Sequence, residues 1–302
     1  MLVGAFSQNG QMAEVPIHAG LADLAPGYDG FIIDLWGVLH DGVAAFPEAL
    51  DCLGRIREAG KRVVILSNAP RRVQSVAARN AELGILAEHY DAVMSSGEDA
   101  WQHLKTRPDT WYKGLGERCF HLGPARDNGM REGLPYDFVE AVEEADFLLN
   151  TGAHDASDTV ETFRPLLESA LARGLPMVCA NPDLEVIRGG RREICAGAIA
   201  VYYEEMGGDV RFHGKPHRAV FEICIDLLGL GDRSRIANIG DSLRTDVAGA
   251  RGAGIDALFV TGGIHAEALG IAPGEMPAAA GLEALCAAAK QCPTAALPRL
   301  QW

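Results

Sequence analysis

The sequence predicts an α/β fold in which a parallel sheet is interrupted by an inserted second domain. Short apolar runs typical of buried strands alternate with amphipathic stretches typical of helices, and this alternation indicates a parallel sheet covered on both faces. The pattern changes after Leu104 and resumes near residue 211. We therefore expect a core domain formed by residues 1–104 and 211–302, with residues 105–210 forming an inserted α/β domain of ordinary size.

The beginning of the core has a β-α-β pattern. The apolar run 31–33 predicts a strand that ends at Asp34, and the glycines that follow permit a tight turn. Residues 46–60 predict a helix, because a proline suits its first turn and a glycine ends it. The apolar run 62–66 predicts a second strand, which stops at Ser67. Further helices are expected at about 19–24, 71–83, 158–173, 218–229 and 277–289 and from about residue 97, and further strands at 92–95, 118–122, 147–150, 177–180, 235–240 and 256–261.

The composition excludes several classes of protein. A hydrophobic fraction of 48% with 23% charged residues is typical of a globular protein, and 302 residues can bury a sizeable core. The formal net charge of −14 argues against a nucleic-acid-binding surface. Seven scattered cysteines without a C-x-x-C pair argue against a disulfide framework or zinc site. We find no apolar run of about 18 residues and no basic region followed by an apolar one at the N-terminus, so we expect a cytoplasmic protein without a membrane partner.

Polar residues follow the predicted core strands at the edge where parallel sheets bind ligands. Asp34, Ser67 and Asp241 each come directly after an apolar strand, and Lys215 precedes the helix at which the core pattern resumes. The carboxyl ends of parallel strands meet at one edge of a sheet, where loops and helix N-termini converge. Carboxylates are hard oxygen ligands for Mg²⁺, while a lysine and a hydroxyl bind a phosphoryl group. The sequence therefore predicts a magnesium-phosphate site.

Four short motifs occur in order along the chain. They are Asp34-Leu-Trp-Gly-Val, Ile65-Leu-Ser67, Gly214-Lys215-Pro216 and Gly240-Asp241-Ser-Leu-Arg-Thr-Asp246. Together they resemble the haloacid dehalogenase superfamily of phosphotransferases. The insertion, with Ala180-Asn-Pro-Asp183 inside it, is similar to that of the class IIA, NagD-like branch, which includes phosphatases of sugar phosphates, phosphoglycolate, pyridoxal phosphate and nitrophenyl phosphate. The resemblance covers about residues 28–265 and implies a Rossmann-like core with an α/β cap domain.

The resemblance implies roles for the residues around the predicted metal. Asp34 would attack phosphorus and form an aspartyl-phosphate, which divides one difficult displacement into two easier ones. Mg²⁺ would be bound by Asp34, by the backbone carbonyl of Trp36 and by Asp241. Asp246 would support these ligands or the metal-bound waters.

The resemblance also implies roles for residues that contact the substrate. Ser67 would donate to a phosphoryl oxygen with help from the Asn68 backbone, and Lys215 would neutralise charge shared by the nucleophile and the phosphoryl group. The cap would close over the site. Within the cap, Asn181 and Asp183 either contact the substrate or shape a turn, since Asn-Pro and Pro-Asp are common turn pairs. Cap surfaces in this branch often form dimers, so a homodimer is a possible partner besides a small phosphorylated metabolite.

Trp36 departs from the family pattern. The superfamily usually has at this position a second Asp, a proton donor of the kind that contributes about 10²–10⁴-fold in rate. Either the substrates need little leaving-group protonation, as aryl and acyl phosphates do, or another residue such as His40 or Asp41 donates the proton, or the site binds phosphate without turnover. The indole either packs within the protein or stacks on a flat substrate group. The primary hypothesis is a Mg²⁺-dependent phosphatase, and the alternative is a phosphometabolite-binding or regulatory protein.

Two further patterns receive structural interpretations. His213 and His217 are four residues apart, but without a third ligand type nearby they are interpreted as ordinary loop histidines and not as a metal pair. The Gly249–Gly254 stretch fails the spacing of a dinucleotide-binding loop and is interpreted as a helix-packing site followed by a turn.

Overall fold

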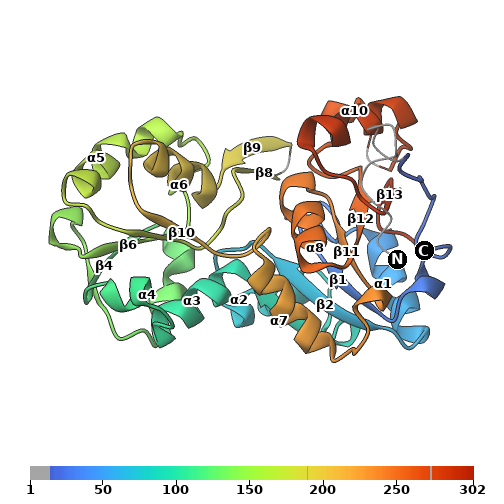
Figure 1. Ribbon diagram of the computed structural model, residues 1–302, viewed down its shortest axis with the longest axis horizontal. Helices are drawn as coiled ribbons and strands as arrows, with labels where there is room; N and C mark the ends of the chain where they lie inside the picture. Colours follow the sequence, from blue (N-terminus) through green and yellow to red (C-terminus); the bar gives the residue numbers. More distant parts are fainter. Residues whose placement is uncertain (1–13, 189, 273) are drawn as a thin grey trace. The chain divides into compact units, whose positions relative to one another are not determined.

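The computed structural model describes residues 14–302, apart from residues 189 and 273, and divides into two compact units (Figure 1). Among the described residues, the first unit contains 14–66, Asn80–Val93 and Pro216–Trp302, and the second contains Ser67–Arg79 and Met94–Lys215. The predicted insertion at 105–210 lies inside the second unit, which extends beyond it at both ends. The predicted absence of a signal peptide rests on residues 1–13, which lie outside the described residues.

A six-stranded sheet organises the first unit, in the order β13-β12-β11-β1-β2-β3. The register of β1 with β2 and β11, and of β12 with β11 and β13, is parallel throughout. The predicted α/β class with a parallel sheet is thus confirmed. The strands are β1 (Gly30–Ile33), β2 (Arg62–Ser67), β3 (Ala92–Ser95), β11 (Ile236–Gly240), β12 (Asp256–Val260) and β13 (Ala295–Leu297).

The direction of chain progression across this sheet reverses between β1 and β11. Later strands β2 and β3 extend the sheet on one side of β1, whereas β11, β12 and β13 extend it on the other. Such a reversal opens a crevice beyond the carboxyl ends of the two strands, and this is where open α/β sheets bind ligands. Every residue of β1 and β11 is buried, so the residues that follow them leave the core at a defined point.

The predicted helices of the core form with small shifts at their ends. In α1 (Pro47–Glu58) the buried residues Ala49, Cys52, Leu53 and Ile56 follow helical spacing. The remaining helices of this part of the chain are α2 (Val73–Glu82), α7 (Arg218–Leu228), α8 (Ala248–Ala253), α9 (Ala266–Leu269) and α10 (Ala279–Ala289), with 3₁₀ turns at Ala87–His89 and Arg233–Arg235 and a π-helical turn, labelled η7, at Leu243–Val247.

One predicted helix of the core is wrong. Residues 19–24 do not form a helix, and a single 3₁₀ turn at Ala25–Gly27 follows them. Pro26 instead occupies the first turn of the 3₁₀ segment, a position that suits proline because its φ is fixed at a helical value.

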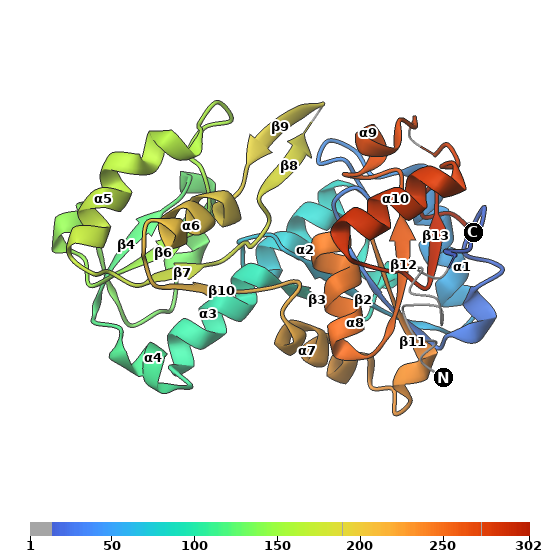
Figure 2. The ribbon, with the colours of Figure 1, turned by 45° about the horizontal axis from the view of Figure 1, so that its top comes forward.

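The second unit is built on a five-stranded sheet of order β10-β7-β6-β4-β5, in which all four neighbouring pairs are parallel. Helices α5 and α6 cover one face of this sheet and α3 and α4 the other (Figure 1). A hydrophobic core lies on each face of the sheet, and successive side chains of β6 point to opposite faces. Leu148 packs with α5 and α6, while Phe147 and Leu149 pack with α3 and α4. An antiparallel hairpin, β8–β9, projects from the unit (Figure 2).

The elements of the second unit include several that the sequence did not predict. The strands are β4 (Arg118–Leu122), β5 (Asp137–Val139), β6 (Phe147–Asn150), β7 (Met177–Cys179), β8 (Glu185–Arg188), β9 (Arg191–Ile194) and β10 (Val210–Phe212), the α-helices are α3 (Ser96–Thr106), α4 (Thr110–Gly114), α5 (Arg164–Ala172) and α6 (Ala196–Glu205), and 3₁₀ turns occur at Ala125–Arg131, Val142–Glu144 and Val160–Phe163.

Candidate active site

Three buried carboxylates meet at the switch point of the first unit's sheet. Asp34, Asp241 and Asp246 each offer a carboxylate oxygen, and these oxygens lie within 4.8 Å of one another. Asp34 follows β1, and its backbone N–H donates a hydrogen bond of 2.9 Å to Ile239 in β11. Asp241 directly follows β11. The structure therefore brings together the three carboxylates that the sequence predicted as metal ligands.

Glycines leave room for the Asp241 carboxylate. A Cβ atom on Gly37 or on Gly263 would lie 2.1 Å from Asp241 Oδ2, a distance that no side chain tolerates. Gly37 also has φ +76°, which favours glycine. The same Asp241 oxygen accepts a hydrogen bond of 2.8 Å from the backbone N–H of Ile264. The carboxylate is thus fixed by backbone on two sides.

Asp246 reaches this cluster from a π-helical turn. Its Oδ2 accepts a hydrogen bond of 3.3 Å from the backbone N–H of Ser242, and the Ser242 hydroxyl caps the turn by accepting from Thr245 N–H at 3.3 Å. A Cβ atom on Gly240 would lie 2.1 Å from Asp246 Cγ, so glycine is required at the end of β11. Single π turns inside helices occur frequently at functional sites, because they redirect a side chain.

The donor set of these three residues fits a hard divalent cation. Carboxylate oxygens are the ligands that Mg²⁺ prefers, and it is bound through few protein groups with waters completing its octahedron. The exposed fractions of Asp34, Asp241 and Asp246 are only 7%, 6% and 1%. Adjacent buried carboxylates repel one another, so a cation bound between them would stabilise their ionised forms.

The loop after Asp34 accounts for the position of Trp36. The indole packs edge-on against the His40 ring with 5.2 Å between centroids, and a Cβ atom on Gly42 would lie 2.3 Å from the indole. Gly42 has φ +85°, which allows the loop to fold under the ring. These contacts favour the packing interpretation of Trp36, and the side chain remains only partly buried.

The two residues considered as alternative proton donors are held differently. Backbone N–H groups of Ala44 and Val43 donate to the Asp41 carboxylate, each at 2.8 Å, and these hydrogen bonds lower the pKa of Asp41. A carboxyl group with a lowered pKa is a poor acid near neutral pH. His40 is buried and its Nδ1 accepts from the Gly42 N–H at 3.0 Å, which places the proton of the neutral ring on Nε2.

The predicted phosphate-binding residues belong to the second unit. Ser67 is the last residue of β2, and Asn68 follows it. The Asn68 side chain accepts a hydrogen bond of 2.8 Å from the backbone N–H of Lys215 and donates to the Lys215 carbonyl at 3.2 Å. Its amide nitrogen also donates to Asp183 Oδ1 at 2.9 Å. Three predicted site residues are therefore joined through one amide.

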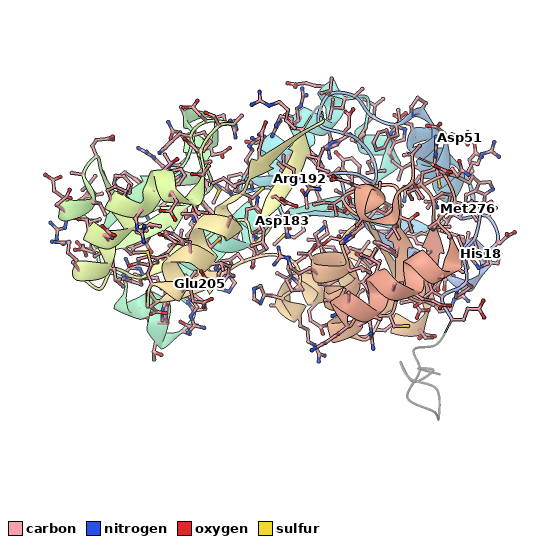
Figure 3. The ribbon with its side chains drawn as sticks, turned by 90° about the horizontal axis from the view of Figure 1, so that it is seen from above. His18, Asp51, Asp183, Arg192, Glu205 and Met276 are labelled. Atoms are coloured by element: carbon pink, nitrogen blue, oxygen red, sulfur yellow. The ribbon has the colours of Figure 1, made fainter. Side chains whose placement is uncertain are left out.

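The Asn-Pro-Asp element forms a turn. Asn181 Oδ1 accepts a hydrogen bond of 2.9 Å from the backbone N–H of Asp183, and Asn181 is buried. Asp183, labelled in Figure 3, is half-buried and is directed to Asn68. A Cβ atom on Gly197 would lie 2.4 Å from the Asp183 carbonyl oxygen, so the first turn of α6 packs closely under this element.

A buried hydrogen-bond network beside Lys215 was not predicted. His213 Nδ1 lies 2.8 Å from Asp99 Oδ2, its Nε2 is paired with the Tyr112 hydroxyl, and His103 Nδ1 lies 2.8 Å from the Asp99 carbonyl. Burial alone would raise the pKa of Asp99, but the hydrogen bonds from His103 and His213 lower it, and the bond to Asp99 raises the pKa of His103. Both nitrogens of His213 are paired within the protein, so these residues form a hydrogen-bond network.

His213 lies in a loop, as predicted, but the sequence did not predict that it is buried in this network. Asp99 and His103 are four apart on α3, which places them on one helix face, and this spacing was the available signal. Their partner on the distant segment was not visible from sequence.

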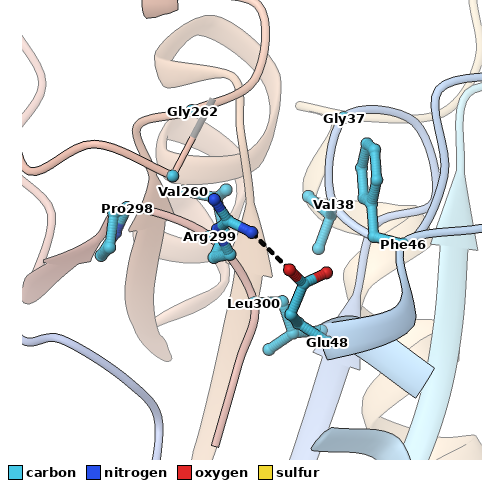
Figure 4. Close-up of a pocket in the computed structure, with 10 residues that line it drawn as sticks. Gly37, Val38, Phe46, Glu48, Val260, Gly262, Pro298, Arg299 and Leu300 are labelled. Carbon is cyan, nitrogen blue, oxygen red and sulfur yellow. Dashed lines mark hydrogen bonds and ion pairs between the residues drawn. The ribbon is translucent and has the colours of Figure 1, made fainter. Parts of the chain in front are cut away.

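A small cavity lies beside the loop that follows Asp34 (Figure 4). Its volume is about 60 Å³, and it is lined by Gly37 and Val38 and closed by an ion pair of 2.6 Å between Arg299 and Glu48. Such a volume suits a few water molecules but not a phosphorylated sugar. Within the described residues, no helix is both long and apolar enough to span a membrane.

Comparisons with known proteins agree with the motifs. Residues 31–134 match a family described as haloacid dehalogenase-like hydrolase, and residues 212–284 match one described as HAD-hydrolase-like. A crystal structure of a haloacid dehalogenase-like hydrolase from Brucella suis is 35% identical, with a TM-score of 0.79 over 94% of this chain and 99% of that one.

Curated relatives are more distant. An acid sugar phosphatase of Staphylococcus haemolyticus is 25% identical over 78% of this chain and 86% of its own. A D-glycerol 3-phosphate phosphatase of Mycobacterium tuberculosis is 28% identical over 81% of this chain and 66% of its own. With the four motifs, the parallel sheet and the 35% identity to the Brucella protein over nearly the whole chain, this protein belongs to the haloacid dehalogenase-like hydrolase family, as a class IIA, NagD-like member.

Proposed function

We propose that this phosphoric monoester hydrolase is a Mg²⁺-dependent phosphatase of small phosphorylated metabolites that acts through an aspartyl-phosphate on Asp34. The observation that carries the proposal is the cluster of Asp34, Asp241 and Asp246 at the switch point of the sheet. Among these three residues, Asp34 directly follows the buried strand β1. The strand therefore holds the backbone of the proposed nucleophile rigidly in place.

The reaction proceeds in two displacements. A carboxylate oxygen of Asp34 attacks phosphorus, the new O–P bond forms as the ester P–O bond breaks, and the leaving oxygen takes its proton from solvent water. Water then attacks the phosphorus of the aspartyl-phosphate, which releases inorganic phosphate and restores the Asp34 carboxylate. When bound by Asp34, Asp241, Asp246 and the Trp36 carbonyl, Mg²⁺ would reduce repulsion between the carboxylate and the phosphate.

Ser67, Asn68 and Lys215 have the roles toward the phosphoryl group that the family motifs imply. Ser67 and the Asn68 backbone donate to phosphoryl oxygens, and Lys215 balances the charge that develops on them. These roles come from the family motifs that the residues match.

The relatives and the net charge support a proposed substrate class. The named relatives act on sugar phosphates and D-glycerol 3-phosphate, so we propose a phosphorylated sugar or polyol as the substrate. A net charge of −14 disfavours polyanions such as nucleic acid. A glycerol phosphate phosphatase from Mycobacterium tuberculosis was crystallised with calcium, which is consistent with a divalent cation in this fold.

One observation favours a second candidate, a phosphometabolite-binding protein without turnover. Trp36 stands where the family has its proton donor, and Asp41, one of the two nearest alternatives, has a lowered pKa. Without a donor, phosphate would be bound but alkyl esters would be released unchanged.

A substrate screen separates the two candidates. The purified protein, with Mg²⁺, is assayed against nitrophenyl phosphate, acetyl phosphate and a set of sugar and polyol phosphates, with Asp34→Asn as the control. We expect turnover that the control lacks. Equal rates for both proteins on every compound would reject the phosphatase, and tight binding of inorganic phosphate in the absence of turnover would favour the binding protein.

We further propose a cytoplasmic location and a homodimer. All seven cysteines lie in the described part of the chain and are free thiols, which suits a reducing compartment. Light scattering of the purified protein tests the dimer directly.

A further inference from the structure

The Asn68 side chain holds the backbone of Lys215 at two points. Its Oδ1 accepts from the Lys215 N–H at 2.8 Å, and its Nδ2 donates to the Lys215 carbonyl at 3.2 Å. The second hydrogen of the same amide goes to Asp183 Oδ1 at 2.9 Å. Asn68 is 4% exposed and Lys215 is 2% exposed, so these bonds are shielded from water.

The surrounding residues show that this arrangement is built for close approach. Gly214 has φ +91°, and a Cβ atom there would lie 2.5 Å from Asn68 Oδ1. On the preceding residue, the His213 carbonyl accepts from the Ser96 hydroxyl at 2.7 Å, and its ring is held by Asp99 and Tyr112. The backbone that leads into Lys215 is therefore fixed as well as Lys215 itself.

We propose that Asn68 and Asp183 are positioning residues for Lys215. The side-chain amide of Asn68 fixes the position of the Lys215 backbone, from which the lysine side chain extends. Asp183 accepts from Asn68 Nδ2 and so keeps Oδ1 of the amide facing the Lys215 N–H. The Asn-Pro-Asp turn thereby contributes to catalysis through Asn68 and needs no contact of its own with the substrate. The inference rests on the proposed role of Lys215 in phosphoryl transfer.

Conservative substitutions of Asn68 and Asp183 change single hydrogen bonds of this amide. Asn68→Asp keeps the shape, but it places a carboxylate against Asp183 and against the Lys215 carbonyl, which are both acceptors. Asp183→Asn keeps an acceptor oxygen at the same place and preserves the bond, whereas Asp183→Ala removes it. Loss of positioning on this scale costs about 10²-fold in rate.

A double-mutant cycle tests the proposal. kcat/KM for nitrophenyl phosphate and the dissociation constant for inorganic phosphate, both with Mg²⁺, are measured for Asn68→Asp, Asp183→Ala and Asp183→Asn, each in the wild-type and the Lys215→Ala background. We expect Asn68→Asp and Asp183→Ala to lower kcat/KM about 10²-fold in the wild-type background and less than about threefold in the Lys215→Ala background, because residues that act through one another are not additive. Asp183→Asn should retain activity within about threefold of wild type in the wild-type background.

The outcomes separate this inference from the proposed function. If Asp34→Asn or Lys215→Ala keeps full activity, the proposed function itself fails. If these two lose activity but Asn68→Asp costs the same factor in both backgrounds, the positioning role is wrong and Asn68 acts directly on the substrate or on folding. If Asp183→Asn is as impaired as Asp183→Ala, the charge of Asp183 acts on the substrate, and its role as a positioning residue is rejected.

Discussion

Trp36 fills its own loop, at the position where the family motif predicts a proton donor. Its indole rests on Gly42 and His40, so the contacts made by this side chain are those of a packed residue. The backbone carbonyl of Trp36 is unaffected by the identity of the side chain, which separates a role in metal binding from a role in proton transfer. We therefore expect that metal affinity and alkyl-phosphate turnover can be changed independently at this residue.

Replacing Trp36 by Asp should extend activity to alkyl phosphates. We expect the ratio of kcat/KM for a sugar phosphate to that for nitrophenyl phosphate to rise by about 10²-fold, since a positioned acid contributes on this scale. Steady-state kinetics measure the ratio. Trp36→Asn is the matched control, because it removes the same indole without adding a proton; an equal change in both variants would show that space and not acidity limits the enzyme.

His121 makes the second unit sensitive to acid. It is 5% exposed, accepts from Arg131 Nε at 3.0 Å and lies 2.9 Å from the Thr151 hydroxyl. Burial and the nearby Arg131 lower the pKa of His121 from 6.5 to about 4. Between these values the unfolded chain binds a proton that the folded chain does not, so the free energy of unfolding falls as the pH drops from 6.5 toward 4.

Urea unfolding should reveal this dependence. Between pH 7 and pH 5 we expect His121 to account for a loss of about 2 kcal/mol, and His121→Gln should remove that part of the slope. The comparison uses the difference in slope between the two proteins, which cancels the contribution of other groups. An unchanged slope in the variant would contradict a buried neutral His121.

The sequence predicted those site residues that directly follow a predicted strand. Asp34 and Asp241 follow fully buried strands, and the parallel arrangement then brings them to one edge. It could not reveal the bonds of Asn68, because its partners lie 115 and 147 positions away along the chain. Such pairings depend on the whole fold and leave no local pattern.

At the scale of elements, the sequence succeeded where periodicity was clear. Strands β4 and β6 have the predicted bounds, whereas α6 was missed because its apolar residues surround the helix and leave no polar face. The short strands β5, β10 and β13 were missed because three residues are too few to establish alternation. The π-helical turn at Leu243–Val247 was also unforeseen, although the glycine and capping serine beside it are consistent with it.

The Gly249–Gly254 stretch behaves as the sequence indicated. A Cβ atom on Gly249 would lie 2.1 Å from the Phe221 ring, so α8 and α7 are in close contact there, and Gly254 ends α8 with φ +74°. The interpretation as a packing site and a turn is confirmed.

A matched pair of substitutions on α8 tests this contact. Gly249→Ala should lower the free energy of unfolding by about 1–3 kcal/mol, because the extra methyl group overpacks against Phe221. Gly252→Ala on the same helix meets nothing within 4 Å and should raise stability by roughly 0.5–1 kcal/mol. Thermal unfolding of both variants measures the difference. Equal effects would mean that helix propensity and not packing decides at these positions.

At the scale of the whole molecule, the proposed metal ligands and the proposed phosphate-binding residues belong to different units. The first unit holds the three carboxylates at its switch point, and the second unit holds Lys215 through Asn68 and the Asn-Pro-Asp turn. The proposed metal therefore binds residues of the first unit alone.

Metal addition should stabilise the first unit selectively. At a Mg²⁺ concentration of 100 times its dissociation constant, we expect about 2.7 kcal/mol of added stability. Calorimetry with Mg²⁺ and with a chelator would show the thermal transition of the first unit moving, while that of the second stays in place. Asp246→Asn should remove the shift, and a shift that persists in this variant would mean that the cation binds elsewhere.

The order of strands also governs how the chain assembles on the ribosome. β1 can pair with β2 once residue 67 has left the ribosome, but its other neighbour, β11, is synthesised more than 160 residues later. Until then the edge of β1 that will face β11 is an open template for pairing with other chains. The second unit, whose sheet lies entirely between these strands in sequence, can fold in the interval. The carboxylate cluster is consequently completed late, so a nascent chain cannot hold the metal before most of its length exists.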